Sequence, residues 1–196
     1  MNANEIKRFI NLKEVNTMTY GEKIELFLAN GTVDSLVTAE VSNWTGKVIK
    51  IPRIEVADCT REDIKDNGVY FLFCRDKVSG EEAVYIGQSE NVHERLKQHI
   101  YDYSAEKEKY FWHTAVVFLG PDLNKAYIRY LENRLVEIAR ECKRFNVLTK
   151  CTYRHSVSKE ADIASLEKYI KYIQMLLNVL GYRVLEPREE SLNHNG

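Results

Sequence analysis

The sequence contains two tripeptides, Gly68-Val69-Tyr70 and Tyr85-Ile86-Gly87, which are separated by fourteen residues. Each tripeptide borders an apolar run, so each predicts a short strand that carries a tyrosine beside a glycine. We expect these strands at residues 69–74 and 82–86, with Lys77-Val78-Ser79-Gly80 as the loop between them. The stretch therefore predicts a β-hairpin with two tyrosines near its strand ends.

The composition is that of an ordinary soluble globular protein. The chain has 196 residues, of which 44% are hydrophobic and 29% are charged, enough for one core or for one core with a small satellite. No segment approaches the roughly 20 apolar residues of a membrane span. The first residues, Met1 to Glu14, lack the apolar centre of a secretory signal. We therefore expect a cytoplasmic protein without a membrane partner.

The cysteines do not predict a disulfide framework. Cys59, Cys74, Cys142 and Cys151 are widely scattered and form no CxxC pair. Cys142, Cys151 and His155 could be considered as zinc ligands, but a fourth ligand is missing. Reduced, structural thiols are the favoured interpretation.

Turn and cap signals divide the chain into three predicted units. Residues 1–58 form a β-rich extension, residues 59–155 a central domain, and residues 156–196 a C-terminal helix with a polar tail. The expected strands outside the hairpin cover 24–29, 35–43, 47–51 and 113–119. The expected helices cover 61–65, 91–103, 124–142 and 159–180, with Asn91 and Ser158 as N-caps.

Arg95 and His99 lie four residues apart on a predicted helix, so they share one face. His99 falls inside the apolar stripe of that helix, and Arg95 lies at its edge. A basic pair at the margin of a buried stripe suits the wall of a cleft. On these two residues alone, an arginine that extends to solvent beside a core histidine is the favoured alternative.

Glu132 stands out among the acidic residues of the helix predicted at 124–142. It shares its face with Ile128, Leu135, Val136 and Ala139, whereas two other glutamates of the helix fall near the opposite side. A carboxylate among aliphatic residues costs free energy unless it is paired or binds a cation. An ion pair with Arg129 or Arg95 and a hard-cation site therefore both remain open.

Twelve tyrosines are present, so only position singles out Tyr70 and Tyr85. A phenol has an ordinary pKa near 10, which makes it a poor base at neutral pH. A neighbouring arginine or divalent cation would lower this pKa and let the phenol orient or deprotonate a water. Taken singly, each tyrosine is more readily explained as an edge or core aromatic.

The ordered set Gly-Val-Tyr, Tyr-Ile-Gly, Arg95-x-x-x-His99, Glu132 and Asn146 resembles the signature of the GIY-YIG nuclease family. The resemblance covers roughly residues 67–150, and Leu123-Asn124-Lys125-Ala126 looks most like a bacterial subgroup. It implies an α+β fold with a small three-stranded antiparallel sheet flanked by helices. It also implies one Mg²⁺ or Mn²⁺ ion bound by Glu132, and a catalytic set of Tyr70, Tyr85, Arg95, His99, Glu132 and Asn146.

In that set, the resemblance gives each side chain a role. Both tyrosines would line the site, and one of them would help to activate the attacking water. Arg95 would hold the scissile phosphate, and His99 would be a further base or phosphate contact. Asn146 would brace the site from the return segment. We thus expect a metal-dependent endonuclease that hydrolyses phosphodiester bonds in DNA.

A net charge of −1 requires any DNA contact to come from a local basic surface. The predicted nucleic-acid contacts are Lys97, Arg140, Lys143, Arg144, Lys150 and Arg154. Two other functions remain open. The scaffold could bind nucleic acid without cutting it, or the apolar stripe of helix 159–180 could dock another protein, with packing on the chain's own core as the favoured alternative. A homo-oligomer and an unidentified protein partner are also left open.

Overall fold

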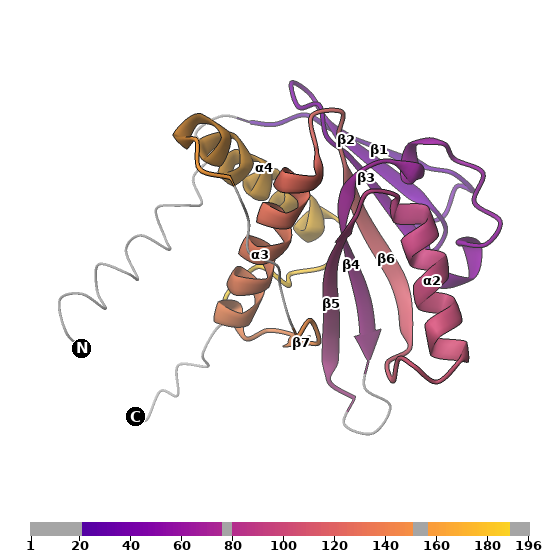
Figure 1. Cartoon of the computed structure of the whole chain (residues 1–196). Helices are drawn as coiled ribbons and strands as arrows, with labels where there is room; N and C mark the ends of the chain where they lie inside the picture. The colour runs from indigo at the N-terminus through magenta and orange to yellow at the C-terminus, as the bar shows by residue number, and fades with distance from the viewer. Residues whose placement is uncertain (1–20, 76–79, 151–156, 189–196) are drawn as a thin grey trace, which may run out of the picture.

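The computed structural model describes residues 21–75, 80–150 and 157–188. These residues form one mixed sheet in the order β1-β2-β3-β6-β4-β5-β7, with helices on both faces (Figure 1). The strands are β1 (Ile24–Leu28), β2 (Val37–Val41), β3 (Lys47–Pro52), β4 (Gly68–Arg75), β5 (Glu82–Ser89), β6 (Trp112–Leu119) and β7 (Asn146–Val147). The helices are α2 (Val92–Ser104), α3 (Lys125–Cys142) and α4 (Glu160–Val179), with short 3₁₀ helices at Arg53–Glu55 and Asp63–Lys65.

Strand β4 is the centre of the sheet, and the hairpin predicted from the two tripeptides is confirmed. β4 pairs with β5 on one side and with β6 on the other, antiparallel in both cases. Seven of its eight residues are buried, which fits a strand covered on both faces by helices and other strands. The predicted loop at Lys77 to Ser79 lies outside the described residues.

The prediction of a small three-stranded antiparallel sheet was wrong. The sheet has seven strands, and β7 runs parallel to β5, so it is mixed. β3 pairs with β6 along its whole length, from Lys47 opposite Leu119 to Pro52 opposite Thr114. Without β3, strand β6 would present a row of unpaired backbone groups at an edge. The predicted N-terminal strands therefore extend the central sheet. The predicted boundary between residues 58 and 59 stays a prediction.

The sheet separates two hydrophobic cores, one on each of its faces. Alternation along β4 directs Tyr70 and Leu72 toward α2, where they pack with Leu96. Phe71 and Phe73 point to the opposite face, which α3 and α4 cover. Figure 1 shows α2 on one side of the sheet and α3 with α4 on the other.

Asparagine caps fix the starts of the two helices that carry candidate residues. The Asn91 side chain accepts a hydrogen bond from the Glu94 amide at 3.1 Å, as its position predicted. The Asn124 side chain accepts from the amides of Ala126 and Tyr127 at 2.9 and 3.0 Å. Both caps satisfy backbone amides that have no partner within the first turn of the helix. The predicted Ser158 cap is not observed, since α4 begins at Glu160 after Lys159.

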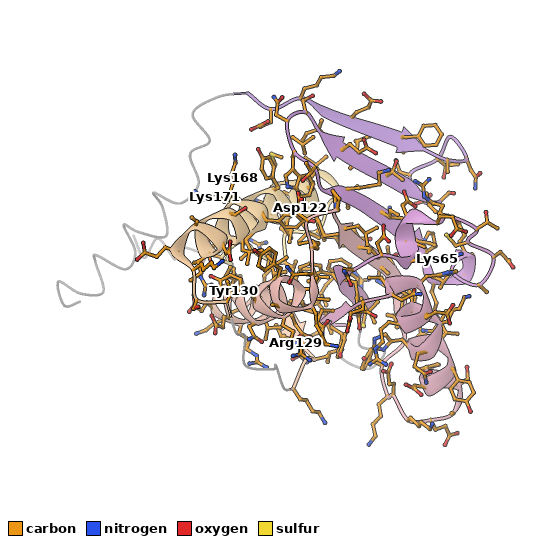
Figure 2. The ribbon with its side chains drawn as sticks, turned by 45° about the horizontal axis from the view of Figure 1, so that its top comes forward. Lys65, Asp122, Arg129, Tyr130, Lys168 and Lys171 are labelled. Atoms are coloured by element: carbon orange, nitrogen blue, oxygen red, sulfur yellow. The ribbon has the colours of Figure 1, made fainter. Side chains whose placement is uncertain are left out.

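Helix α4 packs its apolar stripe on the chain's own core, so the favoured alternative for this stripe is confirmed. Leu166, Ile170, Ile173 and Leu177 are all buried. Tyr130 lies on the side of α3 that faces α4 and donates a hydrogen bond to Glu167 at 2.7 Å (Figure 2). Within residues 21–75, 80–150 and 157–188, no helix combines the length and hydropathy needed to cross a bilayer.

We predict that Gly68→Ala destabilises the fold. A Cβ at residue 68 would lie 2.6 Å from the Phe118 carbonyl oxygen of β6 and 2.8 Å from Leu119 Cδ2. Because a backbone oxygen cannot move without disturbing the sheet, the free energy of unfolding should fall by about 1–3 kcal/mol. Urea denaturation followed by circular dichroism measures this change.

Gly21→Ala is the matched control, because its added Cβ meets nothing within 4 Å among the described residues. It should change the free energy of unfolding by less than about 0.5 kcal/mol. Equal stability of Gly68→Ala and Gly21→Ala would contradict the tight β4–β6 contact.

Candidate active site

Tyr70 and Tyr85 lie on the α2 face of the central hairpin. The antiparallel register places Tyr70 opposite Gly87 and Leu72 opposite Tyr85, so the two tyrosines are diagonal neighbours. Their ring centroids are 6.3 Å apart with an interplanar angle of 26°. A Cβ on Gly87 would lie 2.5 Å from the Tyr70 hydroxyl oxygen. The glycine of the second tripeptide thus makes room for the tyrosine of the first.

Helix α2 adds His99 to the two phenols. The Tyr70 hydroxyl and His99 Nε2 are 2.9 Å apart. His99 Nδ1 lies 2.7 Å from Glu108 Oε1, which comes from the loop between α2 and β6. The imidazole is fully buried and meets the Tyr85 ring edge-on at a centroid distance of 5.1 Å. His99 is therefore held in place by partners on both ring nitrogens.

Arg95 lies one turn before His99 and is half-buried. Its guanidinium interacts with the hydroxyl groups of both Tyr70 and Tyr85. Burial lowers the pKa of Arg95, but the interactions with the two phenols outweigh burial, and the net pKa is raised. The sequence had favoured an arginine that extends to solvent. Instead, Arg95 is a fixed positive charge against both tyrosines.

The electrostatics around His99 define its protonation state. Burial and the nearby positive charge of Arg95 lower the pKa of His99 to about 3, so the imidazole is neutral at neutral pH. A neutral imidazole donates from one nitrogen only, and an ionised carboxylate only accepts. Nδ1 therefore carries the hydrogen donated to Glu108, and Nε2 accepts the hydrogen of the Tyr70 hydroxyl.

The expected fall in the phenol pKa values is not found in the unbound protein. Burial raises the pKa of both Tyr70 and Tyr85, and Arg95 opposes the shift without reversing it. The negative charge of Glu132 adds to the upward shift of both tyrosines. Glu132 and the two phenols therefore share one electrostatic environment, although they come from opposite faces of the sheet.

Glu132 is buried among the aliphatic residues predicted from the periodicity of α3 and is 5% exposed. Its Oε2 has no hydrogen-bond partner among the described residues. Burial raises the pKa of Glu132 to about 7, and attraction to Arg129 offsets only part of this shift. An ion pair with Arg129 thus does not compensate the carboxylate fully.

The Glu132 carboxylate, as an oxygen ligand, suits a hard cation better than a soft one. No group of three or more His, Cys, Asp or Glu side chains with the geometry for a metal occurs in residues 21–75, 80–150 and 157–188. Mg²⁺ is commonly bound by one or two carboxylates, with water and substrate phosphate as its other ligands. A buried carboxylate with an oxygen left unpartnered by the described residues is the feature that such an ion would compensate.

Asn146 does not join the other five predicted catalytic residues. It is exposed, pairs with Ala83 in the β5–β7 ladder, and lines a cavity of about 730 Å³ that none of the other five lines. Thr149 braces the return segment instead. Its hydroxyl accepts from the Ile86 amide at 2.8 Å and donates to the Ile86 carbonyl at 2.7 Å, beside Gly87.

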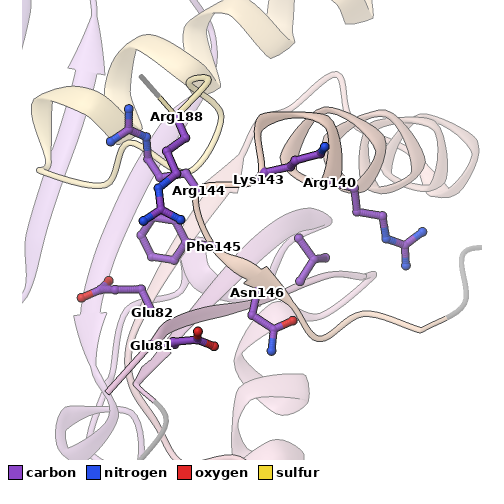
Figure 3. Close-up of a pocket in the computed structure, with 9 residues that line it drawn as sticks. Glu81, Glu82, Arg140, Lys143, Arg144, Phe145, Asn146 and Arg188 are labelled. Atoms are coloured by element: carbon purple, nitrogen blue, oxygen red, sulfur yellow. The ribbon is translucent and has the colours of Figure 1, made fainter. Parts of the chain in front are cut away.

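Three of the predicted basic residues gather around the cavity that Asn146 lines. Figure 3 shows this cavity, with Arg144 and Arg188 on one side and Glu81 and Glu82 on the other. Arg140 and Lys143 also line it. Arg144 uses two of its donors on the carbonyls of Glu186 and Pro187, at 3.2 and 2.8 Å.

The remaining basic residues lie elsewhere. Lys97 forms an ion pair with Glu94 at 3.1 Å, and Lys150 is exposed. Arg154 lies outside the described residues. Arg188 was not singled out from the sequence, because it stands alone in the polar tail.

Two residues of the loop before β6 were also missed. Glu108 contacts His99, and the Tyr110 ring stacks on Tyr85 at a centroid distance of 5.8 Å. Both residues belong to the loop between α2 and β6. A loop has no periodicity from which the direction of a side chain follows, so the sequence offered no signal for either contact.

Comparisons of the chain with models of protein families, with curated proteins and with solved structures find no match. The site therefore has to be interpreted from its own geometry.

We predict that Glu132→Gln changes the pH dependence of stability. The pKa of Glu132 is about 7 in the folded protein and near 4.5 when unfolded, so the folded state binds more protons between these values. Stability from this group is complete below pH 4.5 and is lost as the pH rises through 7. From pH 5 to pH 8, the free energy of unfolding of the unmodified protein should therefore fall by about 2–3 kcal/mol more than that of Glu132→Gln.

Urea denaturation at both pH values measures the difference. Glu141→Gln, on the same helix but exposed, is the control and should keep the pH dependence of the unmodified protein. If Glu132→Gln also keeps the pH dependence of the unmodified protein, the pKa of Glu132 is not raised by burial.

Proposed function

We propose that this chain is a metal-dependent endonuclease that hydrolyses phosphodiester bonds in DNA with a GIY-YIG-type site. One observation carries the proposal. The buried and incompletely compensated Glu132 carboxylate acts electrostatically on Tyr70 and Tyr85. These two phenols in turn interact with Arg95, and Tyr70 contacts His99. Phosphodiester hydrolysis needs a nucleophilic water, compensation of charge on phosphate and help for the leaving oxygen.

Arg95 supplies fixed positive charge for the phosphate. Its guanidinium already interacts with two phenol oxygens. Phosphate oxygens are negatively charged and therefore accept hydrogen bonds from a guanidinium more strongly than phenol oxygens do. Because the group is half-buried and held by its helix, it needs little reorganisation to bind the developing charge. Arg95 thus positions the phosphate beside the two tyrosines.

Glu132 holds the single Mg²⁺ or Mn²⁺ ion through its buried carboxylate. When bound, the ion supplies charge compensation on the phosphoryl oxygens and lowers the pKa of a coordinated water. Glu132 must be ionised for this role, so its raised pKa makes cation binding weaken as the pH falls below about 7.

Tyr70 accepts the proton of the attacking water. A phenol can do so only as it releases its own proton, and His99 Nε2 lies 2.9 Å from the Tyr70 hydroxyl to receive it. The water oxygen forms a bond to phosphorus, and the bond from phosphorus to the leaving oxygen breaks. The leaving oxygen takes a proton from solvent, and His99 returns its proton to solvent through Tyr70.

DNA as the substrate rests on the charges beside β7. Arg140, Lys143, Arg144 and Arg188 line the cavity there, opposed by Glu81 and Glu82. This local excess of positive charge attracts a phosphate backbone despite the net charge of −1. The alternative, a module that binds nucleic acid without cutting, leaves unexplained why the Glu132 carboxylate is buried at a free-energy cost.

We predict that Arg95→Ala and Glu132→Ala each lower cleavage of supercoiled plasmid by about 10²–10³-fold, because each removes a preorganised charge from the transition state. Cleavage by the unmodified protein should require Mg²⁺ or Mn²⁺ and stop when EDTA is added. Gel electrophoresis of the nicked and linear products measures the rates.

The controls are Glu141→Ala and Lys65→Ala, which change exposed charges. Both should cut at the rate of the unmodified protein. A gel shift without cleavage would contradict the proposal and support the non-cleaving module, and full activity of Arg95→Ala or Glu132→Ala would refute the assigned roles.

A further inference from the structure

Glu108 is an acidic residue that the proposed reaction has not yet used. Its side chain is 16% exposed, and its Oε1 lies 2.7 Å from Nδ1 of the fully buried His99. The other ring nitrogen of His99 meets the Tyr70 hydroxyl at 2.9 Å. Tyr70, His99 and Glu108 therefore form a continuous hydrogen-bonded chain from the centre of the sheet to the loop before β6.

The loop holds Glu108 in place through its backbone. The amides of Lys107 and Glu108 both donate to the Asp102 carbonyl, at 2.8 and 3.2 Å. Glu106 adopts a positive φ of 58°, which turns the chain back after α2. The backbone of three consecutive residues is fixed in this way. The turn after α2 therefore directs the Glu108 carboxylate at His99.

His93 shows that a histidine of α2 can be buried without a carboxylate partner. This second buried histidine of α2 bonds the Val56 carbonyl oxygen through Nε2 at 2.8 Å. A neutral backbone acceptor thus serves one nitrogen of His93, and its Nδ1 has no hydrogen-bond partner among the described residues. Glu108 instead brings an ionisable group into a partly buried position, where burial raises its pKa. The negative charge of Glu108 beside His99 therefore suggests a function beyond hydrogen bonding.

We propose that Glu108 is the positioning residue for His99 in the cleavage reaction. By accepting the Nδ1 hydrogen, Glu108 holds His99 in the tautomer whose Nε2 lone pair faces Tyr70. When the Tyr70 proton moves to Nε2, the imidazole becomes an imidazolium with a hydrogen on each nitrogen, and the carboxylate stabilises its charge. The inference rests on the proposed nuclease function, because only that reaction transfers a proton from Tyr70 to Nε2 of His99.

The surroundings explain why this support is needed. Arg95 and Arg53 both oppose a positive charge on His99, whereas Asp102 favours it. With burial acting in the same direction as the two arginines, an imidazolium is strongly disfavoured in the resting protein. A carboxylate in direct contact is the group that can make a transient imidazolium accessible during turnover.

The test combines a measurement of the tautomer with kinetics. Nitrogen-15 NMR of the imidazole at pH 7 should show the Nδ1–H tautomer for His99 in the unmodified protein. In Glu108→Ala this tautomer should lose its dominance, whereas Glu108→Gln keeps an acceptor oxygen and removes only the charge. The kcat for plasmid cleavage should fall by about 10–100-fold, while KM changes by less than about threefold. Glu108→Asp, which keeps the charge on a shorter side chain, should recover part of kcat.

Glu106→Gln is the control, because it removes an exposed charge two residues away on the same loop. It should change neither the tautomer nor kcat. Unchanged kcat in Glu108→Gln, or an Nε2–H tautomer in the unmodified protein, would overturn the proposal. If Glu108→Ala fails to fold, Glu108→Gln decides the question, since it keeps the shape of the side chain.

Failure of the nuclease function itself is distinguishable. Absence of metal-dependent cleavage by the unmodified protein would refute that function and the catalytic purpose of Glu108 with it. The NMR measurement would then still decide whether Glu108 sets the tautomer of His99.

Discussion

The register of the antiparallel pair β4 and β5 is the constraint on which the candidate site depends. It sets Tyr70 opposite Gly87, so that a residue without a side chain lies where the Tyr70 hydroxyl must pass. A slip of one residue would turn both phenols to the other face of the sheet. Thr149 stabilises this register from outside by bonding both backbone groups of Ile86. The geometry around His99 and Arg95 follows from this pairing.

The pKa values of two buried groups differ strongly from their values in water. His99 is neutral although it is surrounded by charged residues, and Glu132 carries a pKa near 7 among aliphatic side chains. A fold selected only for stability would replace either group by an apolar residue. Strongly shifted groups that gather in one region are typical of functional sites, although ion-pair networks can also shift a pKa. Here the shifted groups come from β4, β5, α2 and α3, and thus from segments far apart in the sequence.

The sequence predicted the local elements well because local patterns cause them. The apolar run after Gly68 predicted β4, the Asn91 cap predicted the start of α2, and the position of Glu132 among aliphatic residues followed from helical periodicity. The extent of the sheet could not be predicted in the same way. β3 pairs with β6, so that Val48 lies opposite Phe118, a residue far away in the sequence. No local pattern specifies such a partner.

The site was predictable in part for the same reason. Tyr70, Tyr85, Arg95 and His99 lie on regular elements, whose geometry fixes the direction of a side chain, and the structure brings them together. Glu108 and Tyr110 come from an irregular loop, where backbone closure alone sets the direction. Asn146 was expected in the site, but its side chain lies at the cavity beside β7, and Thr149 contacts the hairpin instead.

A cation at Glu132 would act on the same group of side chains that Tyr70, Tyr85 and His99 form. Titration with paramagnetic Mn²⁺, followed by NMR of the side chains, tests it most directly. We expect saturable broadening centred on Tyr70, Tyr85 and His99, which Mg²⁺ displaces and Glu132→Gln abolishes. Broadening centred on Glu81 and Glu82, or a pattern that Glu132→Gln leaves unchanged, would contradict it.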